Sequence, residues 1–277
     1  MSKIIVTGGA GYIGSHTVRQ LLAGGYEVFV IDDLSTGSEL VLDRRAHFTK
    51  CKIEDRKTVS ELIEKNGIDS VIHFAASTEV ARSVLHPYDF YKNNTVASLE
   101  FIQVCRDSGV KNFIFSSTAA VYKDPGSHKV KETSSLEPST PYGRSKLMTE
   151  YILQDLSKVM NMKWMVLRYF NVAGASQDLQ IGQLGANHSM LVKVAAEAAA
   201  GVRESISIYG TDFHTKDGTG VRDYIYIEDI AELHQLALSH LELGKDCDTV
   251  NCGYGKGYSV HQVIEMMKKV SGNDFLV

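Results

Sequence analysis

The feature that most constrains the fold is a glycine-rich segment near the start of the chain. The run TGGAGYIG (residues 7–14) follows an apolar segment, Lys3–Thr7, and opens a segment of helical period, Tyr12–Ala23. Glycines permit a tight turn and let the backbone approach a pyrophosphate, which a helix N-terminus attracts through its amides and dipole. An acid, Asp32, stands eighteen residues beyond the last glycine, where a carboxylate can bind ribose hydroxyls. The pattern predicts a dinucleotide-binding βαβ unit.

The residues around Asp32 also predict which dinucleotide binds. The 2′-phosphate of NADP would place a second negative charge against this carboxylate. The four residues that follow, Asp33-Leu34-Ser35-Thr36, contain no arginine to neutralise that charge. We therefore expect the chain to bind NAD rather than NADP.

The first two-thirds of the chain alternates apolar runs with segments of helical period. Runs such as Val71-Ile72-His73-Phe74 are continuously apolar or neutral, which is typical of strands covered by helices on both faces. The alternation predicts an α/β fold with a Rossmann-type, doubly wound parallel sheet. The expected strands are Lys3–Thr7, Glu27–Asp32, His47–Cys51, Ser70–Phe74, Asn112–Ser116 and Trp164–Arg168, and the expected helices are Tyr12–Ala23, Arg56–Asn66, Tyr88–Ser108 and Pro141–Met160.

After residue 171 this alternation weakens and a second region begins. There we expect a helix at Met190–Ala200, a strand at Ser205–Tyr209 and a long polar loop at Gly210–Gly220. Residues 1–171 are predicted to form an NAD-binding Rossmann domain, and residues 172–277 a smaller mixed α/β lobe that binds the substrate. Ligands of doubly wound sheets lie beyond the carboxyl ends of the strands, so we expect this lobe to close over that edge.

The composition excludes several other classes of protein. The chain has 29 lysines and arginines against 33 acids, a net charge of −4, which argues against a general nucleic-acid binder. No apolar run approaches the ~20 residues of a membrane span, and no signal segment is expected before the first strand. The histidines are scattered without ligand spacing, so no metal site is expected. Four cysteines are expected to be free thiols in a reducing, cytoplasmic setting: Cys51, Cys105, Cys247 and Cys252.

A tyrosine and a lysine at helical spacing suggest the chemistry. Tyr142 and Lys146 are four residues apart and share one helical face, while the preceding strand ends in hydroxyl residues (116–118). Using a phenol as a base near pH 7 takes roughly 4 kcal/mol, and an ammonium at ~4 Å supplies about as much. We predict that Lys146 lowers the pKa of Tyr142 and that Thr118 holds a substrate hydroxyl. Such a group can remove a proton from an alcohol while a hydride leaves for the nicotinamide.

Six motifs spread along the chain carry a resemblance to a known family. They are VTGGAGYIGSH (6–16), VIHFAA (71–76), NFIFSST (112–118), PYGRSKLM (141–148), LRYFN (167–171) and DGTGVRDYI (217–225). Together they resemble the extended short-chain dehydrogenase/reductase family, and within it the UDP-galactose (UDP-glucose) 4-epimerases of galactose and nucleotide-sugar metabolism. The first motif marks the superfamily, whereas the last is much more particular to the sugar-nucleotide epimerase branch.

The resemblance implies roles for individual residues. Tyr142 would be the catalytic base and acid, Lys146 its partner, and Thr118 the ligand of the sugar O4. Asn171 and Arg222 would bind the nucleotide diphosphate and Tyr209 would pack on uracil, although by themselves Asn171 and Tyr209 indicate packing and Arg222 a surface ion pair. The implied cofactor-binding residues are Gly8, Gly11, Tyr12, Ile13, Gly14, Asp32, Asp33, Ser35, Ile53, Phe74, Ala75, Ala76, Asn93, Tyr142, Lys146 and Phe170, and the implied substrate-binding residues are Thr118, Tyr142, Asn171, Tyr209 and Arg222.

The mechanism that the resemblance implies is oxidation followed by return of the hydride. Tyr142 takes the O4 proton while C4 gives a hydride to tightly bound NAD, and the 4-keto sugar turns over before the hydride returns to its other face. Related dehydratases and decarboxylases carry an acid just after the Ser/Thr, where this chain has Ala119 and Ala120. The alternatives are an epimerase of another UDP-sugar (an N-acetylhexosamine or a pentose), another sugar-nucleotide oxidoreductase, or a non-catalytic NAD-binding protein.

Two further expectations concern the whole molecule. The segments Tyr88–Ser108 and Pro141–Met160 resemble the helix pair that forms a homodimer in this family. The chain stops at Val277, before members of the family usually end, and the missing part normally supplies a second diphosphate-binding arginine. We therefore expect intact NAD binding and a weakened affinity for the UDP-sugar.

Overall fold

The computed structural model describes residues 2–126, 128–159, 161–184 and 190–277. The chain forms two compact units, each assembled from two segments. The first contains Met1–Tyr169 and Glu228–Cys252, and the second contains Phe170–Ile227 and Gly253–Val277. Within the described residues, no helix combines the length and the apolar character that crossing a membrane requires.

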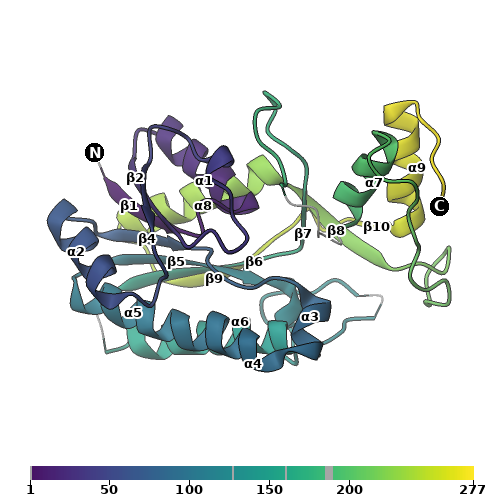
Figure 1. Cartoon of the computed structure of the whole chain (residues 1–277). Helices are drawn as coiled ribbons and strands as arrows, with labels where there is room; N and C mark the ends of the chain where they lie inside the picture. Colours follow the sequence, from purple (N-terminus) through teal and green to yellow (C-terminus); the bar gives the residue numbers. More distant parts are fainter. Residues whose placement is uncertain (1, 127, 160, 185–189) are drawn as a thin grey trace. The chain divides into compact units, whose positions relative to one another are not determined.

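The first unit is built on a seven-stranded sheet in which all neighbouring strands are parallel (Figure 1). The strand order β3-β2-β1-β4-β5-β6-β9 runs outward in both directions from β1, which confirms the predicted doubly wound sheet. The strands are β1 (Lys3–Thr7), β2 (Glu27–Asp32), β3 (His47–Lys50), β4 (Ser70–His73), β5 (Asn112–Thr118), β6 (Lys163–Tyr169) and β9 (Asp248–Cys252).

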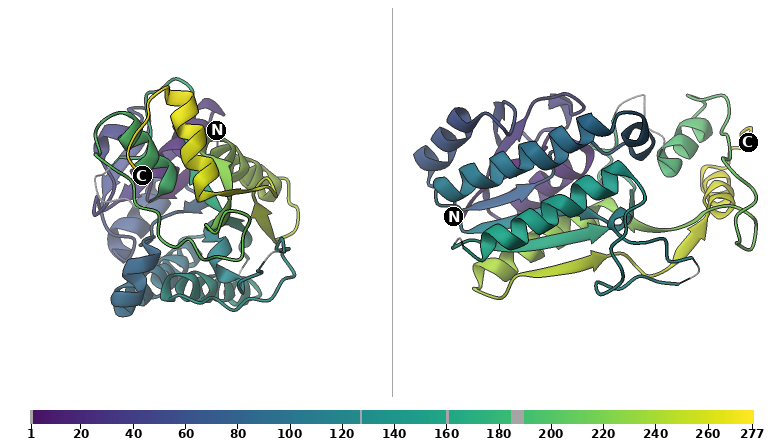
Figure 2. Two further views of the ribbon diagram at one scale, coloured as in Figure 1. Left: turned by 90° about the vertical axis from the view of Figure 1, so that its right-hand side faces the viewer. Right: turned by 90° about the horizontal axis from the view of Figure 1, so that it is seen from below.

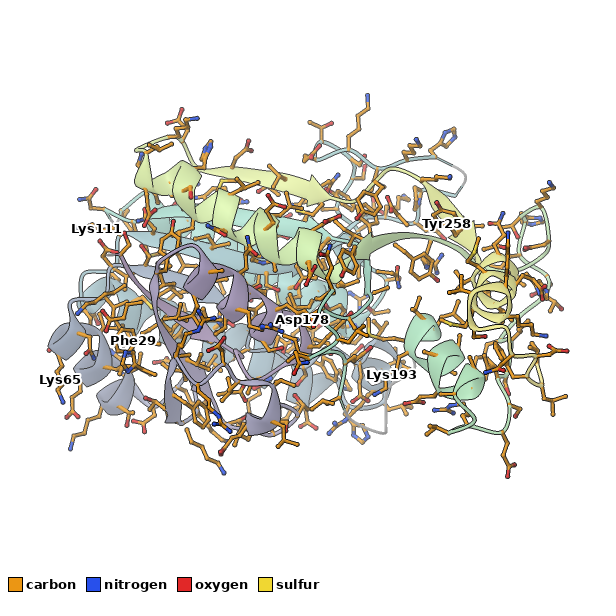
Figure 3. The ribbon with its side chains drawn as sticks, turned by 90° about the horizontal axis from the view of Figure 1, so that it is seen from above. Phe29, Lys65, Lys111, Asp178, Lys193 and Tyr258 are labelled. Carbon is orange, nitrogen blue, oxygen red and sulfur yellow. The ribbon has the colours of Figure 1, made fainter. Side chains whose placement is uncertain are left out.

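Helices cover both faces of this sheet. Seen from above, α1 (Tyr12–Ala23) and α8 (Ile227–Glu242) lie over one face (Figure 3). The opposite face carries α2 (Arg56–Asn66), α5 (Ala97–Asp107) and α6 (Pro141–Ser157), which the view from below shows side by side (Figure 2). The main core lies under these three helices, where Phe101, Phe113 and Val166 are fully buried. Both faces of the sheet are covered by helices and carry apolar side chains. This explains why the strands are continuously apolar in the sequence.

The second unit contains a three-stranded mixed sheet and two packed helices. Its strand order is β10-β8-β7, with β8 antiparallel to β10 and parallel to β7. The helices α7 (Leu191–Ala199) and α9 (Val260–Ser271) pack around a small core that includes Ala195, Ile206 and Ile264. The strands are β7 (Asn171–Ala173), β8 (Val221–Tyr226) and β10 (Gly257–Ser259).

The structure differs from the sequence expectations in four places. Residues 172–277 were expected to form one lobe, but Glu228–Cys252 belongs to the first unit because β9 pairs with β6 at the edge of the large sheet. The expected strand Ser205–Tyr209 is wrong, since the only pairing found there among the described residues is a single bridge from Ser205 to Leu276. The expected helix Pro141–Met160 ends at Ser157, and Met160 lies outside the described residues.

The fourth difference concerns the expected helix Tyr88–Ser108. It consists of α4 (Pro87–Phe90), a π-helical turn at Tyr91–Val96, and α5. A further short helix, α3 (Val80–Leu85), precedes it. In a π-turn each hydrogen bond spans five residues instead of the four of an α-helix, and such turns often mark a functional site. Here it brings Asn93 and Asn94 beside the loop that follows β4.

Candidate active site

The glycine-rich loop joins β1 to α1 in the conformation that a phosphate cradle needs. Gly8 has a φ of +69°, a left-handed conformation that favours glycine. A Cβ at Gly14 would lie 2.2 Å from the carbonyl oxygen of Gly8, so the first turn of α1 can approach the loop only without a side chain. Gly11 is the N-cap of this twelve-residue helix. The loop therefore presents the backbone and the positive end of α1 to an anion.

Asp32 lies at the end of β2, beside this loop. Its two carboxylate oxygens accept hydrogen bonds from the amides of Ala10 (3.0 Å) and Leu34 (2.8 Å). Burial raises the pKa of Asp32, and these two amide bonds oppose that rise. Each oxygen keeps a second lone pair that can accept a ribose hydroxyl. The adjacent Asp33 is exposed and its side chain caps the amide of Ser35 (2.9 Å).

The loop after β4 meets the glycine-rich loop. The amide of Ala75 donates to the hydroxyl of Thr7 (3.3 Å), and a Cβ at Gly8 would lie 2.7 Å from that amide nitrogen. The ring of Phe74 packs against His234 of α8, with 4.6 Å between the ring centroids. The predicted residues Phe74, Ala75 and Ala76 thus belong to the loop after β4, of which Phe74 and Ala75 lie directly beside Gly8. This cradle, with Asp32 beside it, fits a dinucleotide.

Two other predicted cofactor residues lie outside the glycine-rich loop and outside the loop after β4. Ile53 follows β3 and its side chain is buried in the main core. Asn93 is exposed on the π-turn and donates to the hydroxyl of Ser77 (3.0 Å). Its neighbour Asn94, for which the sequence predicts no role, is buried. Asn94 accepts from the amide of Ser77, donates to the carbonyl of Ser77 and donates to the hydroxyl of Ser145 on α6 (3.1 Å). No sequence motif marks Asn94, because its partners are distant along the chain.

The predicted catalytic residues come together at the carboxyl end of β5. Thr140 caps α6 by accepting a hydrogen bond from the amide of Gly143 (3.2 Å), which starts the helix at Pro141. A Cβ at Gly143 would lie 2.3 Å from the carbonyl oxygen of Ala120, so glycine allows α6 to approach the residues after β5. Thr118 is hydrogen-bonded to the phenol of Tyr142. The ammonium of Lys146 donates to the carbonyl of Ser116 (2.9 Å) and lies over the ring of Phe115.

Burial governs the protonation of this group. It raises the pKa of Tyr142, although the hydrogen bond with Thr118 lowers it. It lowers the pKa of Lys146 to about 7, against the attraction of the Glu150 carboxylate. The predicted low pKa of Tyr142 is therefore wrong for the protein chain alone, because desolvation of the phenolate is the largest influence on this pKa and raises it. An oxidised nicotinamide ring supplies a further positive charge when it is bound.

The remaining predicted residues lie in the second unit. Phe170 and Asn171 begin this unit, and Asn171 opens β7, opposite Tyr224 of β8. Tyr209 is 90% exposed. Arg222 is exposed on β8, and its guanidinium donates to the carbonyl of Val221 (2.8 Å).

The neighbour of Arg222 has partners of its own. Asp223 accepts hydrogen bonds from the amides of Tyr254 (3.3 Å) and Gly255 (2.7 Å). Its carboxylate therefore holds the turn between β9 and β10. Tyr209 and Arg222 therefore lie on the surface of the second unit rather than in its core, and their roles as substrate ligands stay predictions.

Comparisons with known proteins agree with this architecture. A UDP-glucose 4-epimerase of Azospirillum brasilense is 42% identical over 270 residues, which cover 98% of this chain and 78% of that protein. The crystal structure of a UDP-glucose 4-epimerase from Brucella ovis in complex with NAD superposes with a TM-score of 0.96 at 37% identity, covering 100% of this chain and 85% of that one. The UDP-Glc/GlcNAc 4-epimerase of Campylobacter jejuni is 48% identical, with a TM-score of 0.86 and coverage of 100% and 86%. The family model described as "NAD dependent epimerase/dehydratase family" matches residues 4–253, and the chain belongs to this family.

Proposed function

We propose that this chain is an NAD-dependent UDP-sugar 4-epimerase that interconverts UDP-glucose and UDP-galactose. The observation that carries the proposal is the buried group of Thr118, Tyr142 and Lys146 at the carboxyl edge of β5. Relatives described as UDP-glucose 4-epimerases, and a neighbour crystallised with NAD, support both the reaction and the cofactor. The glycine-rich loop, Asp32 and the residues after β4 would hold the dinucleotide.

In this proposal the residues of the chain handle the proton while NAD, when bound, accepts and returns the hydride. Thr118 holds the O4 hydroxyl of the sugar against the phenol. Tyr142, as the phenolate, takes the proton from O4 as the C4 hydride departs, and gives a proton back to O4 when the hydride returns to the other face. Lys146 stabilises the phenolate while Tyr142 is deprotonated.

The residues after Thr118 favour epimerisation over elimination. Ala119 and Ala120 occupy the positions where related dehydratases and decarboxylases place an acid. The backbone amide of Ala120 donates to the hydroxyl of Thr118 (3.1 Å). The segment therefore fixes Thr118, while its alanine side chains cannot donate a proton. A 4-keto sugar bound there has no neighbouring acid in this segment to drive loss of water, and the return of the hydride is the step left to it.

Two measurements test the proposal. The nucleotide released from the purified protein should be NAD. Incubation with UDP-galactose should then yield UDP-glucose without net accumulation of NADH, as followed by chromatography and absorbance. Net NADH release would indicate a dehydrogenase, and bound NAD with no turnover of any UDP-sugar would indicate a non-catalytic NAD-binding protein.

A second candidate substrate is a UDP-N-acetylhexosamine. The Campylobacter jejuni protein that is 48% identical is described as a UDP-Glc/GlcNAc 4-epimerase. A panel containing UDP-galactose, UDP-N-acetylgalactosamine and a UDP-pentose separates these activities. We expect the hexose to be epimerised with the highest kcat/KM, and a preference for the N-acetylated sugar would replace the main proposal by this one.

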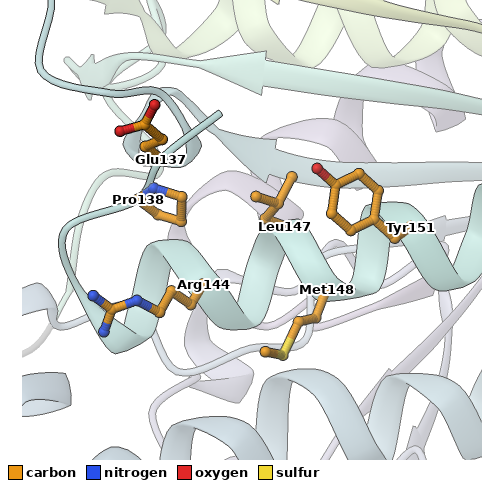
Figure 4. Close-up of a pocket in the computed structure, with 6 residues that line it drawn as sticks. All are labelled: Glu137, Pro138, Arg144, Leu147, Met148 and Tyr151. Atoms are coloured by element: carbon orange, nitrogen blue, oxygen red, sulfur yellow. The ribbon is translucent and has the colours of Figure 1, made fainter. Parts of the chain in front are cut away.

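For the assembly, we propose a homodimer formed through α6 and the helices beside it. Apolar side chains are exposed on this face of the first unit, with Leu85 77%, Tyr88 72%, Met148 44% and Tyr151 48% accessible. Figure 4 shows a hollow along the outer face of α6, lined by Glu137, Pro138, Arg144, Leu147, Met148 and Tyr151. Such apolar patches mark interaction sites. Light scattering should give twice the 30.6 kDa mass of the chain, and the mass of a single chain would contradict the dimer.

For the location, we propose the cytoplasm. All four cysteines carry free thiols, which suits a reducing compartment. Cell fractionation should recover the protein with cytoplasmic markers, and recovery in an oxidising compartment would contradict this assignment.

A further inference from the structure

The end of β5 and the inner face of α6 contact each other residue by residue. Tyr142, Lys146 and Glu150 follow one another at four-residue intervals, so they share one face of α6, and all three are buried. Each contacts one of the last three residues of β5. Tyr142 bonds to Thr118, Lys146 donates to the carbonyl of Ser116, and Glu150 accepts from the hydroxyl of Ser117. Glu150 is thus a third member of the row that contains the two proposed catalytic residues.

The carboxylate of Glu150 is fully buried and is held by an ion pair. The Arg168 guanidinium on β6 donates from Nη2 to Oε2 (2.6 Å) and from Nε to both carboxylate oxygens (3.1 and 3.2 Å). The side chains of Glu150 and Arg168 are 0% and 4% exposed. Taking two charges out of water costs several kcal/mol per ion, which such a pair offsets only with good geometry and further hydrogen bonds. A pair of apolar residues of similar volume would stabilise the fold as much as this ion pair does. The ion pair therefore points to a role other than stability.

The pair is also fixed from its other side. Arg168 Nη1 donates to the phenol oxygen of Tyr122 (3.0 Å), and that phenol donates to the side-chain carbonyl of Asn251 on β9 (2.7 Å). The amide of Asn251 in turn donates to the carboxylate of Glu132 (2.8 Å). These contacts fix the guanidinium of Arg168. Arg168 in turn holds the carboxylate of Glu150, which lies one helical turn from Lys146.

Other charged or titratable groups also surround Lys146. His73 on β4 and Glu150 on α6 interact electrostatically with Lys146 itself. Tyr169 on β6 bonds to the hydroxyl of Ser116, whose carbonyl accepts from Lys146, and Arg168 on β6 bonds to Glu150. Burial lowers the pKa of His73 to about 3, so the imidazole is neutral at pH 7. Burial raises the pKa of Tyr169, so its phenol is neutral as well. The negative charge that opposes the desolvation of Lys146 is that of Glu150.

We propose that Glu150 is a positioning residue for the epimerase reaction, whose buried charge, fixed by Arg168, keeps the side chain of Lys146 protonated and directed to the end of β5. This proposal rests on the proposed function, because it assumes that Lys146 assists Tyr142 in turnover. Glu150 itself contacts neither the sugar nor the dinucleotide in this account. It acts on the reaction only through Lys146.

The test replaces the charge and keeps the shape. Glu150 lies one helical turn from Lys146, and removing its negative charge makes it easier for the coupled Tyr142–Lys146 pair to lose a proton. Both apparent pKa values of the pair should therefore fall. In Glu150→Gln, both limbs of the kcat–pH profile should therefore move to lower pH, by about one to two pH units for a charge at ~6 Å in an effective dielectric of ~20. Glu150→Asp, which keeps the carboxylate, should return the limbs toward those of the wild type. Limbs that stay in place in Glu150→Gln would overturn the proposal.

A second variant and a second readout separate this role from a structural one. Glu150→Gln leaves the Arg168 charge unpaired, which can prevent folding, so the neutral pair Glu150→Gln/Arg168→Met is measured beside it. Its limbs should also move to lower pH. The titration of Tyr142 in the holoprotein, taken as the difference in phenolate absorbance from Tyr142→Phe, should move in the same direction without any turnover. A neutral pair with wild-type phenolate titration would refute the role of Glu150 even if the wild type proved to have no epimerase activity.

Discussion

At the scale of single residues, the hydroxyl of Tyr142 can be removed with little change in packing. Its ring lies edge-on to Phe90 with 6.5 Å between the centroids, and a phenylalanine would keep that contact. Tyr142→Phe should lower kcat by about 10²–10⁴-fold, the range that a positioned proton-transfer group supplies. The NAD content of the purified variant should equal that of the wild type.

The matched control for this prediction is Tyr26→Phe. The Tyr26 phenol donates to Glu242 (3.1 Å) at the far end of α8, so its loss should leave turnover unchanged. Equal kcat values in Tyr142→Phe and Tyr26→Phe would contradict the proton-transfer role proposed for Tyr142.

A second prediction at this scale concerns two buried histidines. Burial lowers the pKa of His73 to about 3 and that of His234 to about 4, both below the ordinary value of 6.5. As the pH falls below about 6.5, each histidine takes up a proton in the unfolded chain but not in the folded one, so the free energy of unfolding falls. The slope is about 1.4 kcal/mol per pH unit for each such group.

The contribution of His234 to this slope can be measured alone. Its Nδ1 bonds to the carbonyl of Ile230 (2.8 Å), while its Nε2 is buried without a hydrogen-bond partner among the described residues. His234→Phe should reduce the slope between pH 4 and 6.5 by about 1.4 kcal/mol per unit in urea titrations. An exposed histidine, His214, serves as control, and His214→Gln should keep the wild-type slope.

At the scale of elements, the junction of β1 and α1 has the tightest backbone packing in the proposed cofactor site. Gly14→Ala would place a methyl group 2.2 Å from the Gly8 carbonyl, which only a backbone shift can relieve. We expect loss of bound NAD and a fall of several kcal/mol in the free energy of unfolding. Gly25→Ala is the control, because Gly25 has a φ of +83° but open space around it. It should cost about 1–2 kcal/mol and keep NAD bound; retention of NAD by Gly14→Ala would contradict the assignment of the cradle.

The elements that the sequence predicts well are those specified by local pattern. Apolar runs and helix signals placed α1 and α2 at their observed bounds, and the expected β1 and β2 match as well. The π-turn at Tyr91–Val96 was missed because its stabilising contacts join Asn94 to Ser77 and Ser145, far apart along the chain. The expected strand at Ser205–Tyr209 had the right composition but found no neighbouring strand to pair with beyond one bridge.

The same distinction holds for the candidate site. The spacing of Tyr142 and Lys146 and the hydroxyls at the end of β5 could be placed together from sequence, since parallel strands end at one edge. The direction of the Tyr142 pKa could not, because desolvation depends on how completely α6 is covered. Glu150 was equally hidden, since its partner Arg168 lies on another strand.

At the scale of the whole molecule, the exposed apolar face of α6 predicts how the proposed dimer can be broken. Tyr151 is 48% exposed on this face, and Tyr151→Arg would place a charge in the interface. We expect the variant to elute and scatter light as a monomer. Leu236, 56% exposed on α8, provides the control, and Leu236→Arg should remain dimeric. Dissociation by both variants, or by neither, would show that α6 is not the interface.

Segments of the two units alternate along the chain, and this alternation determines what happens when a protease cuts the backbone between them. The backbone passes from one unit to the other three times, after Tyr169, Ile227 and Cys252. A cut at any one of these passages yields two fragments that still share at least one folded unit, because α8 and β9 complete the first unit and β10 and α9 complete the second. A protein nicked after Ile227 should migrate as one species on a native gel and as two bands under denaturing conditions. Proteolysis at such a passage would thus leave the molecule severed in its covalent chain yet whole in its fold.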